Sequence, residues 1–74
     1  MDKREVAELM ENIISSIQKA GQDPENQIEA YLITGNELYI TKNGSARGYI
    51  KLLDEQDIEE YLTYYRRNEK RNSR

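Results

Sequence analysis

The sequence contains no cysteine, histidine, tryptophan or phenylalanine, and only one proline. Without cysteine there can be no disulfide, and without cysteine or histidine there is no site for a metal that prefers sulfur or nitrogen ligands. Catalytic dyads built on those two residues are excluded as well, so we expect the protein not to be an enzyme. Glycine-rich motifs that cradle phosphates or dinucleotides are also missing, and we expect no cofactor.

No apolar run approaches the roughly 20 residues that cross a bilayer, and the N-terminal residues carry no signal-peptide core. We therefore expect a cytoplasmic protein that does not interact with membranes. A single domain of 74 residues buries only about 60% of the surface of its unfolded chain. Because disulfides and soft metals are unavailable, a second copy of the chain is the expected supplement to the core, which predicts a homodimer.

Charge is distributed unevenly along the chain. Residues 1–65 hold six basic and thirteen acidic side chains, a net of −7, whereas residues 66–74 hold five basic side chains and one acidic, a net of +4. We expect residues 1–65 to form one helical domain and residues 66–74 to be a frayed basic tail. Because an acidic body does not favour phosphate contacts, nucleic acid is an unlikely partner. Neighbouring acids such as Glu59-Glu60 are interpreted as solvated surface and not as a metal site.

Two helices are predicted in the first half of the chain. The spacing of apolar residues predicts an amphipathic helix over residues 3–19, and Gly21 after it supplies the stop signal. Asp23 followed by Pro24 is typical of a helix start, and Gly35 of a helix end, which places a second helix at residues 24–34. The apolar faces of the two helices consist of Val6, Leu9, Met10, Ile13, Ile14 and Ile17, and of Ile28, Tyr31 and Leu32.

Residues 36–52 permit two interpretations. The composition around Tyr39 and the Asn43-Gly44 dipeptide are compatible with a β-hairpin. Alternatively, residues 36–45 form an irregular or short extended link, and Asn43 or Ser45 caps a third helix. We favour the third helix, although Gly48 would lie inside it at a cost of about 1 kcal/mol.

A last helix is predicted after Asp54, with acids in its first turn and an apolar face of Ile58, Tyr61, Leu62 and Tyr65. The expected fold is therefore all-α, a small bundle of about four helices with a helix-turn-helix-like arrangement. All six aromatic residues are tyrosines, which suit the rim of a core as well as a binding interface.

Several short motifs in the middle of the chain resemble the IreB regulatory phosphoprotein family of Gram-positive bacteria. The family patterns NPxNQI, YLxSGD, YI and AR correspond to DPENQI at residues 23–28, YLITGN at 31–36, YI at 39–40 and AR at 46–47. The resemblance covers about residues 6–65. It implies an all-helical cytoplasmic homodimer that acts as a regulator downstream of a membrane Ser/Thr kinase in the cell-envelope stress response.

The chain departs from this family pattern in two respects. The phosphoacceptor threonines of the family precede the first helix, whereas the first threonine here is Thr34. Phosphorylation is then either lost or transferred to another hydroxyl such as Ser15, Ser45 or Ser73. In addition, Thr41 stands where the family usually has proline, and Gly48 falls within a helix.

The candidate binding residues are those of the matched motifs: Asn26, Gln27, Tyr31, Tyr39 and Arg47. Asn26 and Gln27 lie in the first turn of the second helix, and Arg47 opens the third with a planar fork of five donors. Such a cluster either fixes helix packing or a dimer seam, or recognises a partner protein directly.

The expected function is thus a regulatory protein that binds itself and another protein. The alternative is a nucleic-acid-binding helix-turn-helix or winged-helix module that uses Lys42, Arg47, Lys51 and the basic tail. That alternative requires these cations to share one face.

Overall fold

The computed structural model describes residues 1–72, with side chains through residue 68, as a bundle of α-helices. The elements are α1 (Lys3–Lys19), α2 (Pro24–Thr34), the 3₁₀ turn η1 (Glu37–Tyr39), α3 (Ala46–Lys51) and α4 (Glu55–Asn72). No strand occurs within the described residues, so the all-α prediction is confirmed and the hairpin alternative is wrong. The last two residues of the predicted basic tail, 73–74, lie outside the described part.

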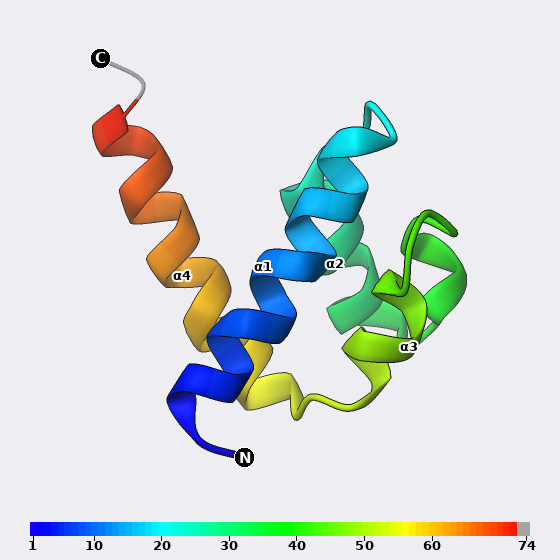
Figure 1. Cartoon of the computed structure of the whole chain (residues 1–74), viewed down its shortest axis with the longest axis horizontal. Coiled ribbons are helices and arrows are strands. Elements are labelled where there is room, and N and C mark those ends of the chain that lie inside the picture. Colours follow the sequence, from blue (N-terminus) through cyan, green and yellow to red (C-terminus); the bar gives the residue numbers. More distant parts are fainter. Residues whose placement is uncertain (73–74) are drawn as a thin grey trace.

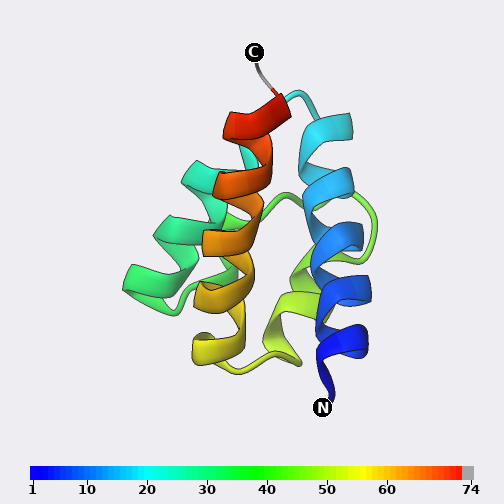
Figure 2. The same cartoon turned by 90° about the vertical axis from the view of Figure 1, so that its left-hand side faces the viewer.

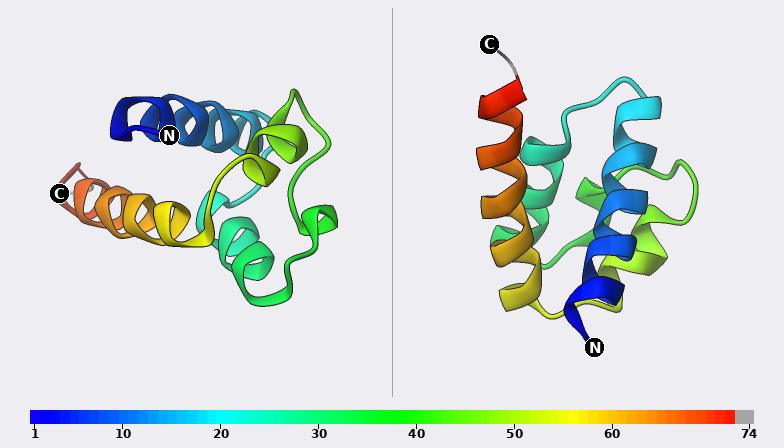
Figure 3. Two further views of the ribbon diagram at one scale, coloured as in Figure 1. Left: turned by 90° about the horizontal axis from the view of Figure 1, so that it is seen from below. Right: turned by 60° about the vertical axis from the view of Figure 1, so that its left-hand side comes forward.

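α1 is the central element of the bundle, and it contacts α2, α3 and α4 (Figure 1). Figure 2 shows α4 with α1 and α2 on either side of it. Seen from below, η1 and α3 lie on the other side of the molecule from the C-terminal half of α4 (Figure 3). The segment around η1 and the face between α2 and the C-terminal half of α4 are therefore separate.

Local signals in the sequence fix the ends of α1 and α2. Asp2 and Glu5 form a reciprocal capping box at the start of α1, a feature that satisfies two backbone donors. Asp23 caps α2 by accepting a hydrogen bond from the Glu25 amide at 3.0 Å. Gly35 ends α2 in the left-handed conformation, with φ at 72°. The predicted bounds of both helices are confirmed.

The core is a single apolar cluster built around α1. Met10, Ile13 and Ile17 are completely buried, and so are Ile28 of α2, Ile50 of α3 and Ile58 of α4. No buried side-chain polar atom among the described residues lacks a partner. Half-buried residues close the rim of this cluster, and four of the six tyrosines are among them: Tyr31, Tyr49, Tyr61 and Tyr65. The rim interpretation of the tyrosines holds for these four.

The N-terminus of α3 is not capped by a side chain in the way that the sequence predicts. Ser45 occupies the N-cap position of α3, but its side chain makes no capping hydrogen bond. Asn43 does not cap α3 either, because its side-chain amide donates to the Ser16 carbonyl of α1 at 2.9 Å. Gly44 has φ at 62°, and a Cβ there would lie 2.8 Å from the Ser16 hydroxyl. The Asn43-Gly44 turn therefore fits against α1, and long-range contact replaces the local cap.

Candidate interaction surfaces

The segment from Leu38 to Thr41 is held in place by side chains from two helices. From α2, the Gln27 side-chain oxygen accepts a hydrogen bond from the Thr41 amide at 2.8 Å. The other end of the Gln27 amide donates to the side-chain oxygen of Gln22. Proline, which the resemblance leads one to expect at position 41, has no N–H. Threonine at this position therefore supplies a backbone N–H that bonds the link to α2.

Arg47 holds the same segment from the α3 side. Its Nε donates to the Ile40 carbonyl at 2.8 Å, and a terminal nitrogen lies 3.5 Å from the Leu38 carbonyl. Charged donors make stronger hydrogen bonds than neutral ones, and the guanidinium fork fixes direction as well as distance. A weaker ion pair, 3.8 Å between Lys51 and Glu37, joins α3 to η1. The backbone of the segment is thus fixed from both sides.

This arrangement presents two large side chains to solvent. Leu38 is 66% exposed and Tyr39 is 50% exposed, while Ile40 beside them is buried in the core. Neighbouring exposed apolar side chains on an ordered surface are typical of protein-binding sites. We refer to residues 38–41, which Gln27 and Arg47 hold and which expose Leu38 and Tyr39, as the display segment.

The five predicted binding residues fall into three groups. Gln27 accepts from the Thr41 amide and Arg47 donates to the Ile40 carbonyl, the two polar groups of one peptide unit, so they meet through the display segment and not directly. Tyr39 belongs to the display segment itself. Asn26 is exposed on α2, and Tyr31 is half-buried against the core. The structure therefore gathers three of the five around one surface.

The cations of the nucleic-acid alternative are largely engaged within the chain. Arg47 bonds to backbone carbonyls, and Lys51 faces Glu37. Lys42 is exposed. The basic side chains beyond residue 68 lie outside the side chains that the structure describes. The nucleic-acid interpretation therefore gains no support from this face of the molecule.

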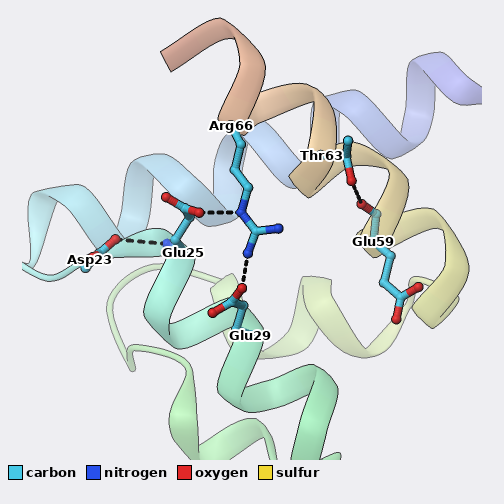
Figure 4. Close-up of polar contacts among 6 residues, drawn as sticks. All are labelled: Asp23, Glu25, Glu29, Glu59, Thr63 and Arg66. Atoms are coloured by element: carbon cyan, nitrogen blue, oxygen red, sulfur yellow. Dashed lines mark hydrogen bonds and ion pairs between the residues drawn. The ribbon is translucent and has the colours of Figure 1, made fainter. Parts of the chain in front are cut away.

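A second surface, which the sequence did not reveal, lies between α2 and α4. A groove of about 440 Å³ is lined by Glu29, Leu32, Ile33, Glu59, Leu62, Thr63 and Arg66. At one end, Arg66 forms ion pairs with Glu25 and Glu29, which lie one turn apart on α2 (Figure 4). Ile33 projects beside it with 84% of its surface exposed.

No local sequence pattern predicts the contact between Arg66 and α2. The sequence places Arg66 both near the C-terminal end of the last helix and at the start of the basic tail, and the structure includes it in α4. Its two acidic partners lie 37 and 41 positions away. The spacing of Glu25 and Glu29 places both carboxylates on one face of α2, and that was the only available indication of a cation site.

Tyr61, on the rim of the core, has a shifted pKa. Burial, with smaller contributions from Glu11 and Tyr64, raises the pKa of Tyr61 above its ordinary value. A raised pKa keeps this phenol neutral and makes it a poorer nucleophile. Within the described residues, no group of three or more acidic side chains is placed to hold a metal ion.

The hydroxyls considered as phosphoacceptors differ in accessibility. Ser45 is exposed in the turn before α3, whereas Ser15 is half-buried within α1. Thr34 and Thr63 are exposed, but each donates a hydrogen bond to a helix carbonyl four residues earlier. Ser73 lies outside the described residues.

None of the helices within residues 1–72 combines the length and apolar character needed to span a bilayer. The model of one protein family, described as the IreB regulatory phosphoprotein, matches residues 1–66. The match covers all of α1 to α3 and most of α4, and it includes both surfaces described above.

Proposed function

Because the chain belongs to the IreB regulatory phosphoprotein family, we propose that it is a non-enzymatic regulator that binds another protein through the display segment. In this proposal it works in the cytoplasm as a homodimer, within a Ser/Thr-kinase-linked pathway of envelope stress. Its family membership supports a regulatory role, and the display segment supplies a surface suited to it.

The fixed exposure of Leu38 and Tyr39 is the observation that carries the proposal. A flexible loop would lose conformational entropy on binding, about 1–2 kcal/mol for each backbone residue that becomes ordered. Here the hydrogen bonds from Gln27 and Arg47 order the backbone in advance. A partner therefore gains the apolar contact area of Leu38 and Tyr39 without that loss. Tyrosine is also among the residues enriched where binding energy concentrates.

Ser45 is the phosphoacceptor that this proposal favours. It is exposed, and its side chain makes no hydrogen bond to the helix that it precedes. A phosphate there would add about −1.5 to −2 charges between Lys42 and Arg47 in sequence. Arg47 also holds the display segment, so a phosphate that attracts its guanidinium would weaken the contacts at Leu38 and Ile40. Phosphorylation and partner binding would then be coupled through one side chain.

Site-specific photo-crosslinking in cells tests the proposed binding surface. Tyr39 is replaced by p-benzoylphenylalanine, which keeps the aromatic ring, and the cells are irradiated. We expect an adduct of the chain with one discrete protein of different mass, identified by peptide sequencing. The adduct should disappear in an Arg47→Ala background, because the display segment then loses its fixed backbone.

The matched control carries the same crosslinker at Tyr64, which is 56% exposed, close to the 50% of Tyr39. Tyr64 lies on α4, away from the display segment. An adduct formed from position 39 alone supports the proposal. Equal adducts from both positions, or none from position 39, would contradict it.

A further inference from the structure

The turn before α3 contains the dipeptide Asn43-Gly44, in which a side-chain amide is followed by a residue without a side chain. Both residues are exposed. The Asn43 side-chain nitrogen donates to the Ser16 carbonyl of α1 at 2.9 Å, and a Cβ at Gly44 would lie 2.8 Å from the Ser16 hydroxyl. One amide group and one close approach therefore hold the turn against α1.

Two atoms of this turn make no hydrogen bond within the part of the chain that the structure describes. They are the backbone nitrogen of Gly44 and the side-chain oxygen of Asn43. Asparagine is among the chemically labile residues, because a neighbouring backbone nitrogen can attack its side-chain carbonyl carbon. Glycine leaves room for that attack, since it has no side chain and is free to change its backbone conformation. Both atoms that ring closure requires are thus available.

We propose that Asn43 is a site of spontaneous deamidation and that its conversion releases the turn from α1. The Gly44 nitrogen attacks Cγ of Asn43 and gives up its proton, while the bond between Cγ and the side-chain nitrogen breaks and ammonia leaves. Water then adds to one of the two carbonyl carbons of the resulting five-membered imide. Opening at the backbone carbon gives isoaspartate, in which the chain runs through the side chain, and opening at Cγ gives aspartate. Water is the only co-reactant, and nothing is oxidised or reduced.

The other four asparagines whose side chains the structure describes lack this combination. Asn12, Asn26 and Asn68 lie within α-helices, where the backbone nitrogen that follows belongs to the helical hydrogen-bond ladder. Asn36 is exposed, but Glu37 follows it with a full side chain, and its own side-chain oxygen caps η1. The turn before α3 should therefore react before any of these four positions.

Conversion breaks the contact with α1, because a carboxylate cannot donate a hydrogen bond. The Ser16 carbonyl loses its donor from the turn, and the new negative charge stands near the C-terminal end of α1, where the helix dipole disfavours it. Isoaspartate also adds a carbon to the backbone beside Gly44, which has no space to move closer to Ser16. Because α3 begins directly after the turn and carries Arg47, the change reaches the side chain that holds the display segment.

Peptide mass spectrometry tests the reaction on the whole chain, incubated for several weeks at neutral pH either folded or in urea. In the folded chain we expect position 43 to gain the mass that distinguishes a carboxylate from an amide before any other asparagine. Aspartate and isoaspartate peptides should both form and separate on chromatography. Conversion at position 43 in urea alone would overturn the proposal, because the fold would then protect Asn43. Earlier conversion at Asn36, the exposed internal control, would overturn it as well.

Asn43→Asp and Asn36→Asp test the structural consequence, because they make the same chemical change at two exposed positions. The Asn43 side chain donates to α1, whereas that of Asn36 accepts a hydrogen bond, a role that a carboxylate retains. The readout is hydrogen exchange of the Tyr49 amide, which donates to the Ser45 carbonyl at 2.9 Å. We expect roughly tenfold faster exchange in Asn43→Asp, which loses a hydrogen bond and gains a repulsion, and the wild-type rate in Asn36→Asp. Equal rates in the two variants would overturn the release of the turn from α1.

Discussion

The core around α1 and the display segment are both ordered, but different forces fix them. Around α1 the contacts are apolar and completely buried, as at Ile13 and Ile17. The display segment contributes only Ile40 to that core, and it is otherwise held by polar side chains from α2 and α3. The outer half of α4 resembles the display segment, because the Arg66 ion pairs connect it to α2.

This difference separates stability from function within a very small chain. Apolar burial is non-directional and tolerates hydrophobic replacement, so it secures the fold. Hydrogen bonds from long side chains contribute little net free energy of folding, but they fix the orientation of the backbone that they contact. They can therefore hold a binding surface in one defined shape. Single substitutions should therefore unfold the core but only loosen the polar regions.

The core should give the largest effect. Ile13→Ala removes a fully buried side chain and leaves a cavity, and we expect a loss of about 2–5 kcal/mol in the free energy of unfolding. Urea denaturation followed by circular dichroism, at one fixed protein concentration, measures it. The matched control is Leu52→Ala, which should change stability by less than about 0.5 kcal/mol. Similar losses in both variants would erase the distinction between core and surface.

Removing the Arg47 fork should have an intermediate effect. Arg47→Ala leaves the carbonyls of Ile40 and Leu38 without their charged donor, and we expect a loss of about 1–3 kcal/mol. Faster amide hydrogen exchange at residues 38–41 should accompany that loss. Arg47→Lys should restore the charge but not the two-point contact. Exchange in Arg47→Ala that stays at the wild-type rate would show that Arg47 does not hold the segment.

The Arg66 ion pairs should contribute less. Their side chains are between 35% and 48% exposed, and exposed pairs are worth at most about 1 kcal/mol each. We expect Arg66→Gln to lower the free energy of unfolding at low salt by at most about 1 kcal/mol for each ion pair that is lost. The loss should be smaller at about 1 M salt, where charges are screened. A double-mutant cycle with Glu29→Gln isolates the pair. A coupling energy unaffected by salt would contradict an electrostatic contact.

Tyr61 should produce the smallest effect, confined to alkaline pH. Its folded pKa is raised, so its contribution to stability is complete below the unfolded pKa of about 10 and is lost as pH rises through the folded value. We expect Tyr61→Phe to lose less stability than wild type between about pH 9 and 11, as judged from urea midpoints. Identical pH dependence would mean that burial does not penalise the ionised phenol.

The sequence predicted the regular elements well because their signals are local. Helical spacing of apolar residues, Asp23-Pro24 and Gly35 located α1 and α2 within the bounds that the structure shows. The third helix was favoured correctly despite Gly48, which is exposed and so costs no core packing. The capping of α3 was predicted wrongly, because Asn43 bonds to Ser16, a partner 27 positions away.

The candidate surfaces were only partly predictable for the same reason. Short motifs identified Gln27, Tyr39 and Arg47, but not that Gln27 and Arg47 bond to the two polar groups of the peptide unit between Ile40 and Thr41. The groove between α2 and α4 was missed, since it depends on Arg66 reaching Glu25 and Glu29 across the fold. Periodicity reports which face of a helix is buried, and it carries no information about long polar side chains that bridge distant elements.

Residue-resolved native-state hydrogen exchange tests most directly the claim that an apolar core supports a separately fixed display segment. We expect the Ile13 and Ile17 amides to exchange only through global unfolding, whereas the Thr41 amide exchanges through a local opening of lower free energy. Arg47→Ala should lower both free energies, because its contacts are lost in either opening, and the Thr41 opening should remain the lower of the two. Exchange of Thr41 together with Ile13 in one cooperative step, before and after this substitution, would show that the core and the display segment are not separately fixed.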